Sequence, residues 1–414
     1  MYSAWLLSLA AVLGVPSPAS AIHLIENSRA PHVEAVEAVS FKDFVVKFNR
    51  SYTEGSSQWA EREAVFAERK KDVLAFLRGR PQSWVMGITK FADYTASEYK
   101  AVLGYKGRRS GGGTEEYMAL ALQRKWTHPP EFTVKSEERK LASLVRDQGG
   151  CGSCWAEAAT AALEGQMEAN ATMMRHLRSV LDGMGKTSQE ATLSSQAFVS
   201  CTRNPRNCGG SGGCDGATVE LAYEMVKERG GVPMAIEWPY ESGFGGTPEC
   251  RESVFQRASV SITGYEVLPS NKLHPLMQAL YQTGGAIAVS VDATNWGMYS
   301  GGIYSDSDYG GDFTVNHAVT LIAYQTPKRE KKGGREELRM GYWLIKNSWG
   351  VSWGEDGFIR LEMKENEEEH CGMDKETHKG LACDGDPNEA WVCGTCGVLY
   401  DSVYPTGVHL IDPA

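Results

Sequence analysis

Residues 148–155 constrain the fold of this 414-residue chain more than any other stretch. They read QGGCGSCW and are followed by the alanine-rich run AEAATAAL. Glycine is a poor helix former and alanine a good one, so the sequence predicts a helix that begins at Cys154. The first turn of a helix has unsatisfied N–H groups and partial positive charge, which favour a thiolate over a thiol. The stretch therefore indicates a reactive thiol at a helix N-terminus.

The first 21 residues have the pattern of a secretory signal peptide. An apolar run spans residues 4–13, and Ala19-Ser20-Ala21 supplies a small-x-small cleavage pattern. No Lys or Arg precedes the run, so a short membrane anchor is the alternative. No other stretch reaches the roughly 20 apolar residues that a span needs, and we expect no stable membrane span. These features predict a route through the secretory pathway to a lysosome, a vacuole or the extracellular space.

The net charge and the number of cysteines are consistent with a secreted protein. A formal charge of -10 and a pI near 5.5 argue against a nucleic-acid binder. Ten cysteines in a secreted chain predict disulfides. Setting Cys154 aside leaves an odd number, so at least one more thiol is expected to be free, metal-bound or intermolecular. Asn49 and Asn170 begin N-glycosylation sequons.

Residues 22–108 predict a small helical domain, because apolar residues recur there at helical spacing. Two faces result: Phe41, Phe44, Val45 and Phe48 form the first, and Val65, Phe66, Val73, Leu74 and Leu77 form the second. Residues 104–113, which include RRSGGG, have the composition of a flexible linker. A domain boundary is expected there or slightly later.

The chain changes character after Trp126. Turn-forming and polar residues predict a loop at residues 129–132 and a helix at 217–228. Residues 170–187 are polar and richer in Met and basic residues than their surroundings. Apolar runs predict antiparallel strands at residues 286–291, 318–324, 342–346 and 357–361. The charged run at residues 328–337 is interpreted as a solvated hairpin tip and not as a binding patch.

A cysteine nucleophile needs a base and a third group that orients the base. Two polar residues are candidates for these roles. His317, in VNHAV, begins a predicted strand and could face a cleft. Asn347, in KNSWGVSWGEDG, lies among Trp residues and could accept the His N–H. A structural histidine and a turn asparagine are the alternatives for these two residues.

Together these motifs resemble those of papain-family, cathepsin-L-like cysteine proteases, in the family's order of Cys, His and Asn. The segment SGGI at residues 300–303, ahead of His317, is part of the likeness. The helical region resembles the family's inhibitory propeptide, through Arg62, Val65, Phe66 and Val73 and through the spacing of Gly87, Phe91 and Asp93. It departs from that pattern at Gln58, Arg69 and Thr89. Compared with the family, residues 170–187 are an insertion, which is expected to form a surface loop.

The resemblance implies an α+β fold. A papain-like fold has two lobes, one helical and one an antiparallel β-barrel-like sheet, and a small helical prodomain would precede them here. The expected domains are a signal peptide at residues 1–21, an inhibitory propeptide with linker at 22–125 and a peptidase domain at 126–414. We expect a monomeric zymogen that its own propeptide inhibits and that acts on protein and peptide substrates.

The resemblance also implies the catalytic roles. Cys154 would attack a peptide carbonyl, His317 would protonate the leaving amine, Asn347 would hold the imidazole, and Gln148 would stabilise the oxyanion with the Cys154 N–H. No cofactor or metal is expected. One alternative is a catalytically silent homologue that binds peptides or proteins. Another is a zinc or redox module at Cys393-Gly394-Thr395-Cys396, but a local disulfide is favoured there because the motif has no βαβ context.

Substrate contacts are expected at Gly216, Ala217, Asp401 and Trp349. The loop GGCDGA at residues 212–217 resembles the family's Gly-Cys-Asn-Gly-Gly loop, which pairs with extended substrate. A methyl group at Ala217 is expected to narrow the second subsite. Asp401 falls at the floor of that subsite, where it would pair with a basic side chain or else point to solvent. The absence of a His-His occluding loop after Cys214 argues against a carboxydipeptidase.

By the same resemblance, Cys151 pairs with Cys214 and Cys201 with Cys250. Cys208 is additional to the family's pattern, and the family's cysteine after Ile303 is missing. The remaining cysteines are placed in a C-terminal extension: Cys371, Cys383, Cys393 and Cys396.

Overall fold

The computed structural model describes residues 29–105, 129–134, 140–183, 185, 192–307, 312–332 and 335–411. The predicted signal peptide and residues 106–113 of the predicted linker lie outside these ranges. None of the helices in these ranges is both long enough and apolar enough to span a membrane.

The N-terminal region is helical, as predicted. It contains α2 (Arg29–Ala38), α3 (Phe41–Lys47), α4 (Ser57–Arg78) and α5 (Ala96–Val102). Helix α3 begins at a capping box in which the Ser40 hydroxyl accepts the Asp43 N–H. Phe41, Phe44 and Phe66 pack as a buried aromatic cluster, which confirms the two apolar faces. This region therefore has a core of its own.

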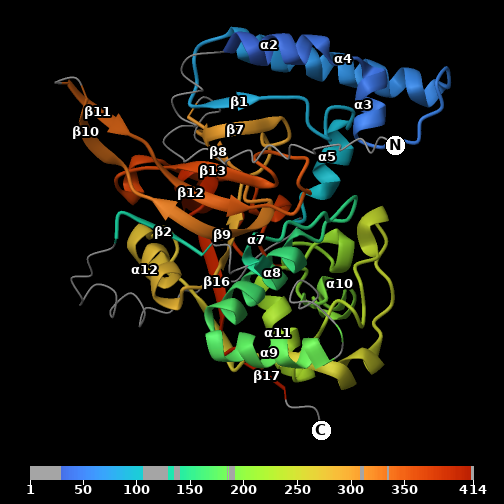
Figure 1. The fold of residues 1–414 in the computed structure, drawn as a ribbon, viewed down its shortest axis with the longest axis vertical. Helices are drawn as coiled ribbons and strands as arrows, with labels where there is room; N and C mark the ends of the chain where they lie inside the picture. The colour runs from blue at the N-terminus through green and yellow to red at the C-terminus, as the bar shows by residue number, and fades with distance from the viewer. Residues whose placement is uncertain are drawn as a thin grey trace, which may run out of the picture.

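A short strand of the N-terminal region pairs with the main sheet. Strand β1 (Trp84–Met86) pairs antiparallel with β7 (Tyr299–Tyr304) at the end of the main sheet. The Trp84 ring is fully buried against Phe76 of α4 and Tyr304 of β7. Figure 1 shows the blue helices beside β1 and β7, with the green helices at the other end of the molecule.

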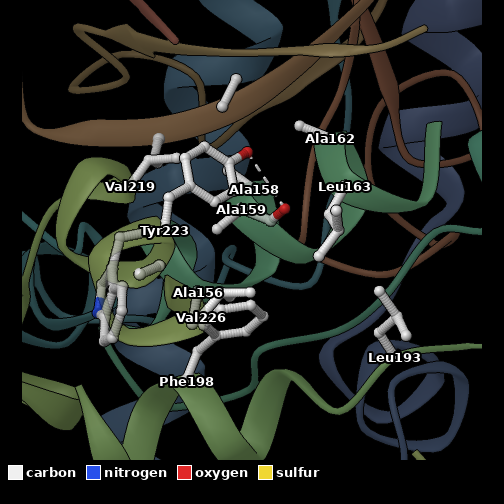
Figure 2. Close-up of a cluster of buried hydrophobic side chains, with 14 of the residues drawn as sticks. Ala156, Ala158, Ala159, Ala162, Leu163, Leu193, Phe198, Val219, Tyr223 and Val226 are labelled. Atoms are coloured by element: carbon white, nitrogen blue, oxygen red, sulfur yellow. Dashed lines mark hydrogen bonds between the residues drawn. The ribbon is translucent and has the colours of Figure 1, made fainter. Parts of the chain in front are cut away.

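The green helices form a helical lobe around α8 (Cys154–Ala169). Nearly every side chain of α8 is buried, because α10 (Ser195–Cys201), α11 (Val219–Arg229) and the main sheet surround it. Figure 2 shows its small alanine side chains next to Phe198 of α10 and Tyr223 of α11. The Tyr223 hydroxyl donates to the Ala159 carbonyl. The alanines permit this close packing of helices.

The surface loop predicted at residues 170–187 is wrong. Helix α9 (Ala171–Gly183) occupies most of this stretch, and the Asn170 side chain caps it by accepting the Met173 N–H. Met173, Met174 and Leu177 are buried in the core of the helical lobe. The predicted loop overlooked these apolar positions at helical spacing among basic residues.

The second lobe is built on one curved sheet. Its strands are hydrogen-bonded in the order β1-β7-β13-β12-β9-β6-β16-β5. The remaining bounds are β5 (Gly264–Val267), β6 (Ile287–Val291), β9 (His317–Gln325), β12 (Gly341–Lys346), β13 (Phe358–Met363) and β16 (Asp401–Thr406). The four predicted strands are confirmed as β6, β9, β12 and β13. The charged run forms an exposed hairpin of β10 (Lys328–Lys332) and β11 (Arg335–Arg339), also as predicted.

Smaller elements complete the fold. Strand β2 (Glu131–Thr133) pairs with β9, so the loop predicted at residues 129–132 is wrong for residues 131 and 132. Helix α12 (Leu273–Thr283) packs against β9, and α7 (Lys140–Ser143) against α8. A separate sheet joins β3 (Val232–Pro233), β4 (Ala258–Ser261) and β17 (His409–Leu410).

The late cysteines do not lie in a C-terminal extension. They belong to residues 364–400, which connect β13 to β16 within the main sheet and which we call the β13–β16 connection. Its strands β14 (Cys371–Asp374) and β15 (Ala390–Cys393) form a sheet with β8 (Asp312–Phe313). Strand β16 of the main sheet therefore follows this connection in the chain.

The predicted Cys393–Cys396 disulfide is also wrong. Cys371 and Cys393 face each other across β14 and β15 and form a disulfide, and Cys208 pairs with Cys383. Cys396 lies in a turn with positive φ, and its buried Sγ accepts the Trp296 indole N–H instead. Cys154 and Cys396 are the two free thiols, which accounts for the odd count.

Candidate active site

Cys154 is the first residue of α8, as predicted, and it is fully buried. Its Sγ accepts the Ala318 N–H at 3.3 Å. Burial raises the pKa of the thiol to about 11, although backbone N–H groups of Ala318, Gly104 and Trp155 act to lower it. The closed site thus holds a neutral thiol where the sequence favoured a thiolate, because burial outweighs the helix N-terminus.

His317 and Asn347 meet at the ends of neighbouring strands. His317 begins β9, Asn347 follows β12, and the imidazole Nε2 lies 2.8 Å from the Asn347 Oδ1. The ring of Trp349 packs over the imidazole with 4.8 Å between centroids. Burial lowers the pKa of His317 to about 4, and the hydrogen bond to Asn347 only partly opposes this. An imidazole that donates from Nε2 keeps Nδ1 available to take a proton.

Gln148 lies beside these residues with its amide held at both ends. Its Oε1 accepts the Ser348 hydroxyl at 2.6 Å, and its Nε2 donates to the Cys151 carbonyl at 2.8 Å. The same Nε2 donates, also at 2.8 Å, to the carbonyl of Val102, the last residue of α5. The amide therefore already holds a carbonyl oxygen supplied by the N-terminal region.

Residues 104 and 105 continue that segment through the site and are not linker, which corrects the prediction for these two positions. A Cβ on Gly104 would lie 2.5 Å from the Cys154 Sγ, and a Cβ on Gly216 would lie 1.9 Å from the Gly104 carbonyl oxygen. Tyr105 donates its N–H to the Asn316 carbonyl at 3.1 Å. A glycine is needed where the backbone passes this close to the thiol.

The Tyr105 side chain fills a pocket next to the thiol and is 2% exposed. Its hydroxyl lies 3.1 Å from the Ser290 Oγ, and Ser290 donates to the Asp401 carboxylate at 2.5 Å. Asp401 is 2% exposed, so the solvent-facing alternative is wrong. Ala217 belongs to the same buried cluster as Tyr105. Of the four expected substrate contacts, Trp349 lies apart from this pocket and packs on His317.

Two disulfides brace the helical side of the site. Cys151 is bonded to Cys214 and Cys201 to Cys250. The first links the loop that carries Gln148 to the loop that carries Gly216. The second links the end of α10 to the segment before η4 (Glu252–Arg257).

Sequence reasoning missed Lys90, which lies in the loop after β1. Its ammonium is 2.7 Å from both carboxylate oxygens of Asp147 and 3.1 Å from the Trp349 carbonyl. The only sequence signal was a lysine inside the Gly87–Asp93 motif, and nothing in the sequence marks a partner 57 residues away. Ser290 and Ser348 were missed because single serines carry no pattern.

A model of the papain family of cysteine proteases matches residues 128–381, more than half of the chain. The chain belongs to the papain family of cysteine proteases. A second model, the cathepsin propeptide inhibitor domain, matches residues 41–99. This papain-family protease thus carries the inhibitor domain, which we call the prodomain, whose continuation through residues 102–105 occupies the cleft.

Named relatives are similar in sequence to most of this chain. Procathepsin L of Rattus norvegicus is 30% identical over 331 residues, which cover 78% of this chain and 86% of that protein. Cathepsin J of Mus musculus is 29% identical over 341 residues, covering 80% and 89%. Among solved structures, a recombinant stem bromelain precursor has a TM-score of 0.59 at 24% identity, covering 91% of this chain and 99% of that one. It shares the papain-like fold with its prodomain.

Proposed function

We propose that the mature protein is a cysteine endopeptidase whose catalytic residues are Cys154, His317, Asn347 and Gln148. The observation that carries the proposal is the convergence of these groups on one buried point. The Cys154 Sγ accepts the Ala318 N–H, His317 is hydrogen-bonded to Asn347, and the Gln148 amide holds a carbonyl oxygen. A nucleophile, an oriented base and an oxyanion donor are the parts that acyl transfer requires.

The reaction follows from these positions once the prodomain leaves. Water then solvates the site, and the pKa of the Cys154 thiol falls as that of His317 rises, so that a proton passes from sulfur to imidazole. The thiolate attacks the substrate carbonyl, and the Gln148 amide and the Cys154 N–H stabilise the oxyanion. The imidazolium protonates the leaving amine, and an acyl-enzyme remains. His317 then takes a proton from water, which hydrolyses the acyl-enzyme and restores the thiol.

In the autoinhibited form, the prodomain covers the groups that would bind substrate. The Val102 carbonyl takes the Gln148 donor, Gly104 covers the thiol and Tyr105 fills the neighbouring pocket. We infer that removal of a propeptide spanning about residues 22–125 opens the cleft to protein and peptide substrates. The proposed setting is the secretory pathway, with a lysosomal, vacuolar or extracellular destination, and the proposed state is a monomer.

The pocket that holds Tyr105 suggests the substrate preference at P2, the second residue before the scissile bond. Its floor presents the Ser290 hydroxyl and the Asp401 carboxylate to the Tyr105 hydroxyl. Side chains that end in a hydrogen-bond donor would match this floor, whereas an aliphatic side chain would leave it unmatched. A panel of peptides with Tyr, Arg, Lys or Leu at P2 tests the preference. Equal rates for Leu and for the donor-bearing side chains would contradict it.

The main test is to acidify purified proenzyme under reducing conditions, sequence the new N-terminus and assay peptide hydrolysis. We expect activity to appear together with a new N-terminus near residue 126, and an epoxide thiol probe to label Cys154. The variant Cys154→Ala should remain a proenzyme without activity. Turnover retained by this variant would overturn the mechanism. A matured protein that neither hydrolyses peptides nor reacts with the probe would instead favour the silent, peptide-binding homologue.

A further inference from the structure

The β13–β16 connection runs along the chain segment that leads to His317. Strand β14 pairs parallel with β8, and the Asp374 carboxylate accepts the Val315 N–H at 3.0 Å. A Cβ on Gly380 would lie 2.2 Å from the Val315 carbonyl oxygen, so the two backbones are in close contact. The connection therefore packs on the sheet side of the cleft, where it contacts Val315.

From there the connection crosses to the helical lobe. The Cys208–Cys383 disulfide joins residues 175 positions apart and ties the connection to the loop at residues 202–212. Backbone bonds flank it on both sides: Gly209 donates to the Ala382 carbonyl at 3.2 Å, and Asp384 donates to the Arg206 carbonyl at 2.8 Å. Arg206 also pairs with the Asp386 carboxylate at 3.1 Å. One segment of the sheet lobe is thus locked onto the helical lobe.

The junction between these two segments lies beside the pocket that holds Tyr105. A Cβ on Gly209 would lie 3.0 Å from the Tyr105 Cδ1. Leu381, next to the junction, is 3% exposed and belongs to the same buried cluster as Tyr105, Ala217 and Val315. A pocket closed on this side limits the size of its occupant, because a packed wall yields only at a cost in strain.

We propose that the junction of the loop at residues 202–212 with the β13–β16 connection is a specificity element, which sets the upper size of the P2 side chain. The Cys208–Cys383 disulfide holds this wall in place, and the buried side chain of Leu381, next to Ala382 in the chain, packs in the same cluster as Tyr105. The proposal rests on the proposed peptidase function. It adds a wall to the pocket, whereas Ser290 and Asp401 form its floor.

The test compares mature enzymes on fluorogenic dipeptide amides with Leu, Tyr or naphthylalanine at P2. The variants are Leu381→Ala, which shortens the wall, and the pair Cys208→Ser with Cys383→Ser, which releases it. The matched control is Cys371→Ser with Cys393→Ser, which removes a disulfide from the same connection but away from Tyr105. Reducing agent is removed before the assay so that the disulfides of the parent enzyme remain intact.

We expect the ratio of kcat/KM for naphthylalanine over Leu to rise about tenfold in Leu381→Ala and in the Cys208/Cys383 variant. The control pair should keep the ratio of the parent. An unchanged ratio in an active Leu381→Ala enzyme would overturn the inference even if the Cys208/Cys383 variant fails to fold, while the peptidase assignment would stand. If the parent cleaves none of the peptides, the proposed function fails first and this inference with it.

Discussion

Lys90 of the prodomain lies 2.7 Å from both carboxylate oxygens of Asp147, which immediately precedes Gln148. The same ammonium donates to the carbonyl of Trp349, whose ring covers His317. The ammonium group of Lys90 therefore contacts both the loop that carries the oxyanion donor and the turn whose Trp349 ring covers the base. Lys90 thus ties the inhibitory prodomain to the two segments that hold Gln148 and Trp349.

Substituting Lys90→Met should weaken autoinhibition. The side chain of Lys90 is 10% exposed and that of Asp147 is 49% exposed, so we expect a loss of about 1–2 kcal/mol, or roughly tenfold in the rate of autoactivation. The measurement is the half-time for activity to appear at mildly acidic pH. Lys42→Met is the matched control, because the Lys42–Glu54 pair of the same domain is exposed on both sides. Equal half-times for the two variants would argue against the link.

Acid should loosen the prodomain through Glu98. The Arg62 guanidinium lowers the pKa of Glu98 to about 2, through two hydrogen bonds of 2.5 Å. A depressed carboxyl pKa stabilises the fold above about pH 4.5, and this contribution is lost as the pH falls from about 4.5 towards 2. It amounts to roughly 1 kcal/mol once screening at a partly exposed site is considered. In the Cys154→Ala proenzyme, Tm should fall over this range, and Glu98→Gln should flatten the fall.

The thiol of the proenzyme should react slowly with alkylating agents. The pKa of Cys154 is raised to about 11 and that of His317 lowered to about 4, so both groups are neutral between these limits. Alkylation by iodoacetamide at pH 7 should be at least about 100-fold slower in the proenzyme than in the mature enzyme. A Cys396→Ala background removes the other free thiol from the measurement. Similar rates in the two forms would contradict a neutral, covered pair.

Gln148→Ala should lower kcat by about 10²–10³, the usual effect of losing one oxyanion donor. KM should change little, because the donor acts mainly on the charge that develops in the transition state. Ser348→Ala is an informative companion, since it leaves the amide in place but removes the hydroxyl that donates to it. We expect a smaller loss there. An effect of Gln148→Ala confined to KM would assign the amide to substrate binding alone.

Much of the fold could be predicted from local patterns. Strands β6, β9, β12 and β13 are rich in apolar residues, and the start of α8 follows from glycines that give way to alanines. The candidate catalytic residues could be named because short motifs surround Cys154, His317 and Asn347. Each of these signals lies within a few residues, where sequence reasoning is strongest.

The errors concern partners that are distant in sequence. The connectivity of Cys208 and Cys383 depends on a crossing between lobes that no local pattern encodes. Gly104 has the composition of a linker, yet its role is a close approach to Cys154, and a lone sequence does not distinguish the two. Helix α9 is an exception: it was missed because residues 170–187 are an insertion relative to the family, and an insertion was expected to form a surface loop.

The pairing of β1 with β7 has a consequence for the enzyme after maturation. While the prodomain is attached, β1 satisfies the outer hydrogen-bonding groups of β7, and β13 satisfies the inner ones. Departure of the prodomain turns β7 into an open sheet edge, and such edges promote intermolecular strand pairing and aggregation. The prodomain thus also covers the β7 edge of the sheet. The mature enzyme should therefore self-associate more readily than its precursor at equal concentration.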